Sequence, residues 1–175
     1  MSLIALQAPE NTTGRTREIY EFVDRMLGKI PHAMQLFGHN VMLMEFMNNR
    51  FTYYHGQQKE LTPELMHWIL YLNAQRKQCV FCIDYNKGQL LAAGIPEEVL
   101  NAAVSDPGVT PLPKKEKAML IFALDTARDD KSATPDQIES LRKLGYSDTA
   151  IFNAVEFTAF GTFSDTLLNV FQVET

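Results

Sequence analysis

The sequence predicts an all-α protein, and three observations support this fold class. Runs in which β-branched or aromatic residues alternate with polar ones, the pattern of a half-buried strand, are nearly absent. Apolar residues instead recur at i, i+3, i+4 and i+7 spacing in segments along the chain, which is the pattern of amphipathic helices. Residues that begin or end helices bound these segments, among them Thr62 and Pro63 at one start and Gly94 at one end.

The first expected helices occupy about residues 15–55. In the segment REIYEFVDRML the apolar residues form one stripe, and Pro31 interrupts the helical backbone after it. Residues 33–54 are rich in methionine and apolar on more than one side. We therefore expect this segment to be buried on several faces, against the chain or another subunit, with a break at Gly38. The stripe of the first segment consists of Ile19, Phe22, Val23, Met26 and Leu27.

The rest of the chain predicts a further series of helices. Thr62 caps the first of them, whose segment MHWILYLNAQ is apolar nearly all round and is expected to lie centrally. Another helix should run from near Cys79 to Gly94, followed by a short one after Pro96 and an amphipathic one over KEKAMLIFALDTAR. Thr134 begins the next with the spacing of a capping box, and TAFGTFSDTLLNVFQV is expected to be the last helix.

Two stretches of the chain share one order of caps and core positions. A leucine lies 33 residues before a glycine in both, Leu61 before Gly94 and Leu112 before Gly145, so the stretches are offset by 51 residues (112 − 61). We interpret the stretches at about 61–104 and 112–155 as a duplicated helical unit within one domain of residues 1–175, packed about a pseudo-twofold axis. Convergent amphipathic patterning is the alternative explanation.

The composition excludes several function classes. The 175 residues suit one domain, and the formal net charge of −5 argues against nucleic acid as a partner, because phosphate neutralisation needs a concentrated basic face. The opening MSLIALQAPENTTGR lacks the cationic start of a signal peptide, and no run of about 18 apolar residues is present to span a membrane. We therefore expect a cytoplasmic protein that binds neither nucleic acid nor a membrane.

Both cysteines lie in the stretch QRKQCVFCIDYN, where Cys79 and Cys82 are three positions apart. The pair has three interpretations: a redox dithiol, part of a metal site, or two buried structural cysteines. A structural zinc site needs four ligands, and no histidine stands at ligand-pair spacing near the pair, so we expect no metal and no cofactor. On a helix, i, i+3 spacing places both sulfurs on one face, and the N–H groups at a helix start stabilise a thiolate. The pattern favours a dithiol that cycles with a disulfide.

Several motifs together resemble one family. LGKIPHAMQLF, LTPEL, CVFC, GIPEEVLNAA and GYSDTAIFNAV look like the AhpD-like alkylhydroperoxidases of the carboxymuconolactone decarboxylase superfamily, in particular its two-unit, peroxidase-related branch. The resemblance covers about residues 15–173 and implies an all-α fold, a homo-oligomer (a trimer or hexamer) and reduction of hydroperoxides. It also implies that Cys82 attacks the peroxide, while Cys79 resolves the product and receives electrons from a lipoyl or other thiol donor. Helix-dipole reasoning alone favours Cys79 as the thiolate, so this division of labour stays open.

The chain departs from that family at the proton relay. Redox members carry a Glu twelve residues before the first cysteine and a His four residues after the second, where this sequence has His67 and Asn86. Asn86 cannot act as a base but can orient a thiolate or a water. His67 is either a replacement base or a hydrogen-bonded core histidine. A missing base commonly lowers a rate by about 10²–10⁴-fold, so weak peroxidase activity is expected.

Two other functions remain as alternatives to the thiol peroxidase or disulfide reductase. One is a non-redox member of the superfamily that binds or converts a small organic molecule in a pocket lined by His67. The other is an oligomeric structural protein whose cysteines are buried and unreactive.

Overall fold

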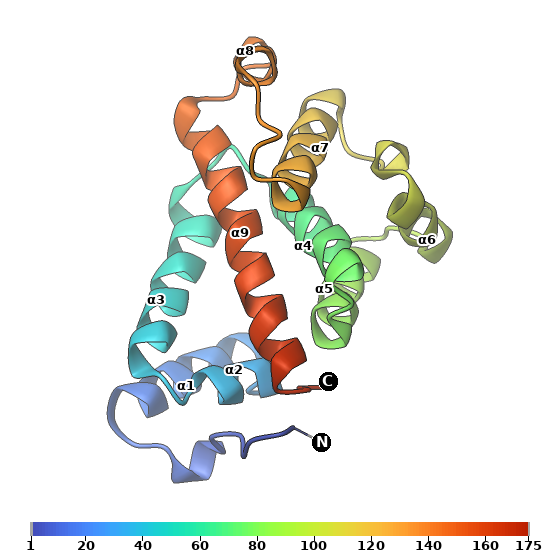
Figure 1. The fold of residues 1–175 in the computed structure, drawn as a ribbon. Helices are drawn as coiled ribbons and strands as arrows, with labels where there is room; N and C mark the ends of the chain where they lie inside the picture. The colour runs from blue at the N-terminus through green and yellow to red at the C-terminus, as the bar shows by residue number, and fades with distance from the viewer. Residues whose placement is uncertain (1, 175) are drawn as a thin grey trace. The chain divides into compact units, whose positions relative to one another are not determined.

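The computed structural model describes residues 2–174, and throughout that range the regular secondary structure is helical, with no strand (Figure 1). The predicted all-α fold class is confirmed. The chain forms two compact units. The first comprises the chain up to Lys59 together with the segment from Leu167 onward, and the second comprises Glu60–Thr166. No helix in the described range is long and apolar enough to cross a membrane.

The first unit contains the predicted N-terminal helices. The break expected near Gly38 is present, and Asn40 begins the next helix by accepting the backbone N–H groups of Met42 and Leu43 at 3.1 Å each. The two earlier helices both contact this third one. The helices are α1 (Gly14–Leu27), α2 (His32–Phe37) and α3 (Val41–Thr52), and a π-helical turn, Tyr53–Gln57, continues α3.

Burial in this unit differs from the expectation at two places. The stripe of α1 is buried at Ile19, but Met26 and Leu27 at its end are 56% and 43% exposed. Residues 33–54 were expected to be buried on several faces, against the chain or another subunit; within α3 this chain buries only Met44 and leaves Met42 70% exposed, so the part of the expectation that concerns another subunit stays a prediction. A hydrophobic pattern shows which residues are apolar, but not whether the same chain supplies an element to cover them.

Gly38 lies against a buried tyrosine. A Cβ atom at this position would be 2.3 Å from the hydroxyl oxygen of Tyr20. Tyr20 is 1% exposed, and its hydroxyl donates to the carbonyl oxygens of Gln7 and Met34, each 3.1 Å away. The ring is held at both ends, so it has little freedom to move aside for an added methyl group.

We expect Gly38→Ala to destabilise the protein by about 1–3 kcal/mol, because the added methyl group overpacks the site and displaces the Tyr20 hydroxyl from its acceptors. The measurement is the free energy of unfolding in urea. Gly56→Ala is the control, because a Cβ at Gly56 meets nothing within 4 Å. Equal stabilities of the two variants would contradict the prediction.

The second unit is arranged around α4, which contacts α5, α6 and α7. Its buried residues lie all round the helix and include Trp68, Ile69 and Tyr71, so the predicted central position is confirmed. Thr62 caps α4 by accepting the N–H of Leu65 at 3.2 Å, as expected. The helices are α4 (Pro63–Lys77), α5 (Val80–Ala92), α6 (Glu97–Ser105), α7 (Lys114–Arg128), α8 (Pro135–Lys143) and α9 (Asp148–Val170), which begins in this unit.

Helix bounds in this unit follow the proposed offset of 51 residues. It relates both ends of α4 to those of α7, the end of α5 to that of α8, and the start of α6 to that of α9. Gly94 and Gly145 both adopt left-handed backbone, with φ of 88° and 85°. Leu61 and Leu112 are both buried. These correspondences support the duplication, which remains our proposal; α8 differs by starting four residues later than the offset places it.

Candidate active site

A tight reversal between α4 and α5 positions the two cysteines. Gln78 ends α4 in left-handed backbone, with φ of 53° and ψ of 37°. The N–H of Cys79 then donates to the carbonyl oxygen of Ala74 at 3.1 Å, which closes the end of α4. Cys79 occupies the position just before α5, without a capping hydrogen bond from its side chain, and Cys82 lies in the first turn. The expectation of a helix beginning near Cys79 is confirmed.

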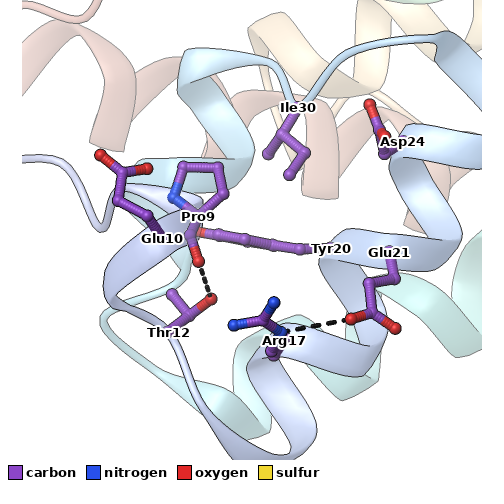
Figure 2. A pocket seen from close by; sticks show the side chains of 8 residues that line it. All are labelled: Pro9, Glu10, Thr12, Arg17, Tyr20, Glu21, Asp24 and Ile30. Atoms are coloured by element: carbon purple, nitrogen blue, oxygen red, sulfur yellow. Dashed lines mark hydrogen bonds and ion pairs between the residues drawn. The ribbon is translucent and has the colours of Figure 1, made fainter.

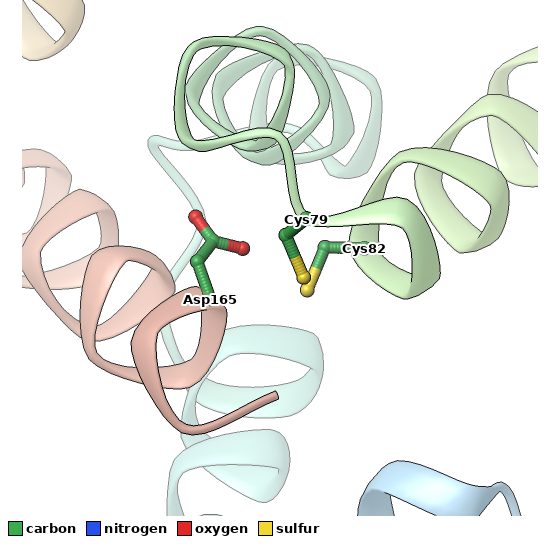
Figure 3. A group of neighbouring side chains, drawn as sticks. All are labelled: Cys79, Cys82 and Asp165. Carbon is green, nitrogen blue, oxygen red and sulfur yellow. The ribbon is translucent and has the colours of Figure 1, made fainter. Parts of the chain in front are cut away.

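The cysteines meet a carboxylate from a distant part of the sequence. The sulfurs of Cys79 and Cys82 and a carboxylate oxygen of Asp165 all lie within 4.8 Å of one another (Figure 3). Asp165 belongs to α9 and is only 3% exposed, and Cys79 is 1% exposed. Cys82 is half-buried, and both cysteines are free thiols. Cys82 is therefore the more exposed of the two cysteines.

Asp165 is fixed by a buried amide. Asn73, on α4, is 1% exposed and donates to Asp165 Oδ2 at 3.0 Å and to Thr162 Oγ1 at 3.1 Å. The amide oxygen of Asn73 accepts a hydrogen bond from Arg76 at 3.2 Å. One turn before Asp165, a Cβ at Gly161 would lie 2.6 Å from Leu70 Cδ2, so the missing side chain lets α9 approach α4 closely.

The three groups of the cluster change one another's acidity. Burial raises the pKa of Asp165, and hydrogen bonds from the two thiols partly offset this. The pKa of Cys79 is lowered, chiefly by the hydrogen bond from the Cys82 thiol, against the opposing effect of burial. The pKa of Cys82 is raised, first because it donates that hydrogen bond and then because of burial and the nearby Asp165 charge. Of the two thiols, Cys79 therefore loses its proton more readily than Cys82.

Acidity and access consequently point to different cysteines. Cys79 carries the lower pKa, in agreement with the helix-dipole argument, but it is buried. Cys82 is the sulfur that a reagent can reach, and it holds its proton more tightly. An attack by Cys82 therefore requires a group that removes this proton.

The structure brings His67 and Asn86 together. His67 Nδ1 lies 3.1 Å from Asn86 Oδ1, an acceptor, so Nδ1 carries the hydrogen. Asn86 is 3% exposed and donates to the backbone carbonyl oxygen of Cys82 at 2.8 Å. Burial lowers the pKa of His67, which favours the neutral ring. In the part of the chain that the structure describes, the hydrogen bonds of Asn86 thus reach the Cys82 backbone, not its sulfur.

The sequence matches no protein-family model and no curated protein. Solved structures, in contrast, match nearly the whole chain. An uncharacterized peroxidase-related protein from Ralstonia eutropha JMP134, described as an alkylhydroperoxidase AhpD core, is 18% identical with a TM-score of 0.84, over 98% of this chain and 90% of its own. A peroxidase-related protein from Silicibacter sp. TM1040 is 16% identical with a TM-score of 0.81, and the match covers 98% of this chain and 90% of that one. The chain has the AhpD-like fold. The resemblance seen in the sequence motifs is thereby confirmed for the fold.

A third structure broadens the chemistry seen around the AhpD-like fold. The debrominase Bmp8, solved as a cysteine-to-alanine variant in complex with 2,3,4-tribromopyrrole, is 16% identical with a TM-score of 0.72. The match covers 99% of this chain and 93% of that one. Identities this low establish a shared fold and transfer no activity.

Asp165 is the residue of this candidate site that the sequence interpretation missed. A signal was available, because Asp165 is the only charged residue between Glu156 and Glu174. A lone carboxylate on a largely uncharged helix is costly to bury unless it is paired. Its partner could not be identified from spacing, because the two cysteines lie more than 80 residues earlier in the chain.

Two thiols and a carboxylate are also donors that a thiophilic divalent ion accepts. Cys79, Cys82 and Asp165 would supply three ligands, whereas a closed structural zinc site has four. Sulfur and carboxylate ligands must be deprotonated to bind, so any such ion would compete with the protons of the dithiol. The expected absence of a metal remains a prediction.

A separate hollow lies in the first unit (Figure 2). Its volume is about 210 Å³, and mainly polar residues line it, including Arg17, Glu21 and Asp24. Arg17 Nε donates to Glu21 Oε1 at 3.2 Å, so these two charged side chains form an ion pair. His67 does not line this hollow. The hollow is therefore not the pocket that the non-redox alternative requires.

Proposed function

We propose that this protein is a dithiol peroxidase or disulfide reductase of the AhpD type, which reduces a hydroperoxide through a cycle between the Cys79 and Cys82 thiols and their disulfide. The observation that supports it most directly is the pair of free thiols placed side by side at the start of α5, with Cys82 accessible. Two thiols within reach of each other can form a disulfide after one of them has been oxidised.

The reaction needs two steps. The Cys82 sulfur attacks the terminal peroxide oxygen, an S–O bond forms as the O–O bond breaks, and the alcohol leaves with the thiol proton. The Cys79 sulfur then attacks the Cys82 sulfenic acid, an S–S bond replaces the S–O bond, and water leaves with the second proton. Two electrons pass from the dithiol to the peroxide, and a lipoyl or other thiol donor returns them by disulfide exchange.

His67 and Asn86 are proposed to support this cycle by holding the first turn of α5. The amide of Asn86 binds the Cys82 carbonyl oxygen, and His67 fixes the amide in turn. These hydrogen bonds fix the Cys82 backbone while its sulfur passes from thiol to sulfenic acid to disulfide.

A second candidate is reductive dehalogenation of a halogenated aromatic compound, which the structural match to a debrominase bound to tribromopyrrole favours. The same dithiol would supply the two electrons. A thiol sulfur would take the halogen, the ring carbon would take a proton, and the second thiol would displace halide as the disulfide forms. The products would be the dehalogenated ring, halide and the disulfide.

Assembly and location are part of the same proposal. We propose a homo-oligomer, because the apolar residues Met42 and Phe46 on α3 are 70% and 47% exposed. A second copy of the chain would bury this apolar surface. A cytoplasmic location suits the cycle, since thiol donors there keep dithiols reduced.

The deciding measurement counts free thiols in the wild-type protein before and after one equivalent of organic hydroperoxide, with peptide mapping under non-reducing conditions. We expect both thiols to disappear, a Cys79–Cys82 disulfide to form, and a dithiol reductant to restore them. A parallel arm with a tribrominated pyrrole distinguishes the second candidate by release of bromide. Persistence of both thiols in both arms would remove the redox proposal and leave the non-redox alternatives.

A further inference from the structure

The dithiol lacks the family's usual relay but has a different acid–base group beside it. Asp165 is within 4.8 Å of both sulfurs, and Figure 3 shows its carboxylate turned toward them. We propose that Asp165 is the catalytic acid and base of the dithiol. In this inference, which rests on the proposed function, it accepts the Cys82 proton as the sulfur attacks and delivers that proton to the departing oxygen.

The position of the carboxylate suits proton transfer. Asn73 holds one carboxylate oxygen at 3.0 Å, which fixes the carboxylate relative to the sulfurs. Both sulfurs lie within 4.8 Å of a carboxylate oxygen of Asp165, so a thiol proton has a short path from sulfur to oxygen. A carboxylate that is 3% exposed is also shielded from competition by bulk water.

Burial and the neighbouring groups shift the pKa of Asp165 in opposite directions. Burial favours the protonated carboxyl, whereas the two thiols, Lys77 at the end of α4 and Asn73 favour the ionised form. These opposing influences make the two protonation states closer in free energy than they are for an exposed carboxylate. A group that must both take and give a proton within one cycle works best in that condition.

The proton balance of the cycle then closes within the cluster. In the first step the Cys82 proton passes to the Asp165 carboxylate as the S–O bond forms, and the carboxylic acid protonates the alkoxide released from the O–O bond. In the second step the Cys79 proton follows the same route to the hydroxide released from the sulfenic acid. Asp165 ends each step ionised, and the net products are the disulfide, the alcohol and water.

The Cys79 thiolate is the competing base, because it accepts a hydrogen bond from Cys82. The two assignments predict opposite outcomes. If Asp165 is the base, Cys79→Ser still forms the Cys82 sulfenic acid, whereas Asp165→Asn does not. If Cys79 is the base, the effects are exchanged.

The test compares Asp165→Asn with wild type in two single-turnover reactions, with an organic hydroperoxide and with iodoacetamide. The leaving alkoxide needs a proton and the leaving iodide does not. We expect the peroxide rate to fall by about 10²-fold or more. Alkylation should not fall, because removing the Asp165 charge lowers the pKa of both thiols and increases the thiolate fraction. Asp84→Asn, an exposed carboxylate on α5, is the control and should react like wild type.

An unchanged peroxide rate in Asp165→Asn would overturn the inference, and so would an equal fall with both reagents, which indicates a distorted site. If wild type itself consumes no peroxide, the proposed function fails instead. Should Asp165→Asn not fold, proton uptake on oxidation of the wild type by the hydroperoxide decides, because two protonated thiols give disulfide, alcohol and water with no net proton release. The thiols lower the pKa of Asp165, so their oxidation raises it and the carboxylate takes up protons from the solvent. Proton uptake at acidic pH, where both thiols are protonated, supports the inference, and no uptake there overturns it.

Discussion

Cys82→Ser is expected to abolish the reaction with peroxide, whereas Cys79→Ser should react once and stop. In Cys82→Ser the remaining sulfur belongs to Cys79, which is 1% exposed and out of reach of most reagents. In Cys79→Ser the accessible sulfur remains, so it forms a sulfenic acid that has no neighbouring thiol to resolve it. The measurement is trapping of the sulfenic acid with a dione reagent followed by mass spectrometry.

The two serine variants are well matched. Serine is a good helix cap, so Cys79→Ser should preserve the start of α5, and a hydroxyl at position 82 still donates a hydrogen bond. Their far-UV circular dichroism should therefore equal that of wild type. A sulfenic acid that forms in Cys82→Ser and not in Cys79→Ser would reverse the assignment of the attacking thiol, in favour of the helix-dipole argument.

Asn73→Leu is expected to destabilise the protein by about 2–4 kcal/mol at neutral pH, because it leaves the buried Asp165 carboxylate without its amide donor. The folded-state pKa of Asp165 is already raised by burial, so stability falls as pH rises from the unfolded pKa through the folded one. Loss of the amide raises the folded pKa further. The cost of the substitution should therefore shrink as the pH is lowered and the carboxyl becomes protonated. Urea unfolding at several pH values measures it.

A double-mutant cycle separates the hydrogen bond from packing. In an Asp165→Asn background no buried charge remains, so Asn73→Leu should cost less than in wild type. The difference between the two costs is the interaction free energy of the pair. Equal costs in both backgrounds, with no dependence on pH, would show that Asn73 contributes only packing and its bond to Thr162.

The fold was largely predictable from local signals. Caps and turn residues act within a few positions of the chain, and Thr62, Thr134 and Gly94 each stand at the boundary where the sequence placed them. The exposure of Met42 and Phe46 on α3 was not predictable, because the sequence shows that a residue is apolar but not whether the same chain covers it. Local physics determines where helices begin and end, whereas coverage depends on the tertiary arrangement.

Only the residues of the candidate site that lie close together in the sequence were predictable. Cys79 and Cys82 share one helix start, and the hydrogen bond between His67 and Asn86 joins two residues that the sequence had singled out. Asp165 lies beside the thiols on α9, and its hydrogen bond from Asn73 on α4 joins segments that are far apart in sequence. No periodicity or motif encodes such a contact, so the third member of the cluster required the fold.

The distance in sequence between the thiols and their carboxylate has a consequence for biosynthesis. Cys82 precedes Asp165 by 83 residues (165 − 82), so a ribosome that adds roughly 5–20 residues per second makes the thiols about 4–17 s before the carboxylate. Throughout that interval the nascent chain carries an ordinary pair of cysteines, open to oxidants and without a proton acceptor. The cluster of two thiols and a carboxylate is complete only after α9 has been made and has packed, so its assembly waits for the last helix.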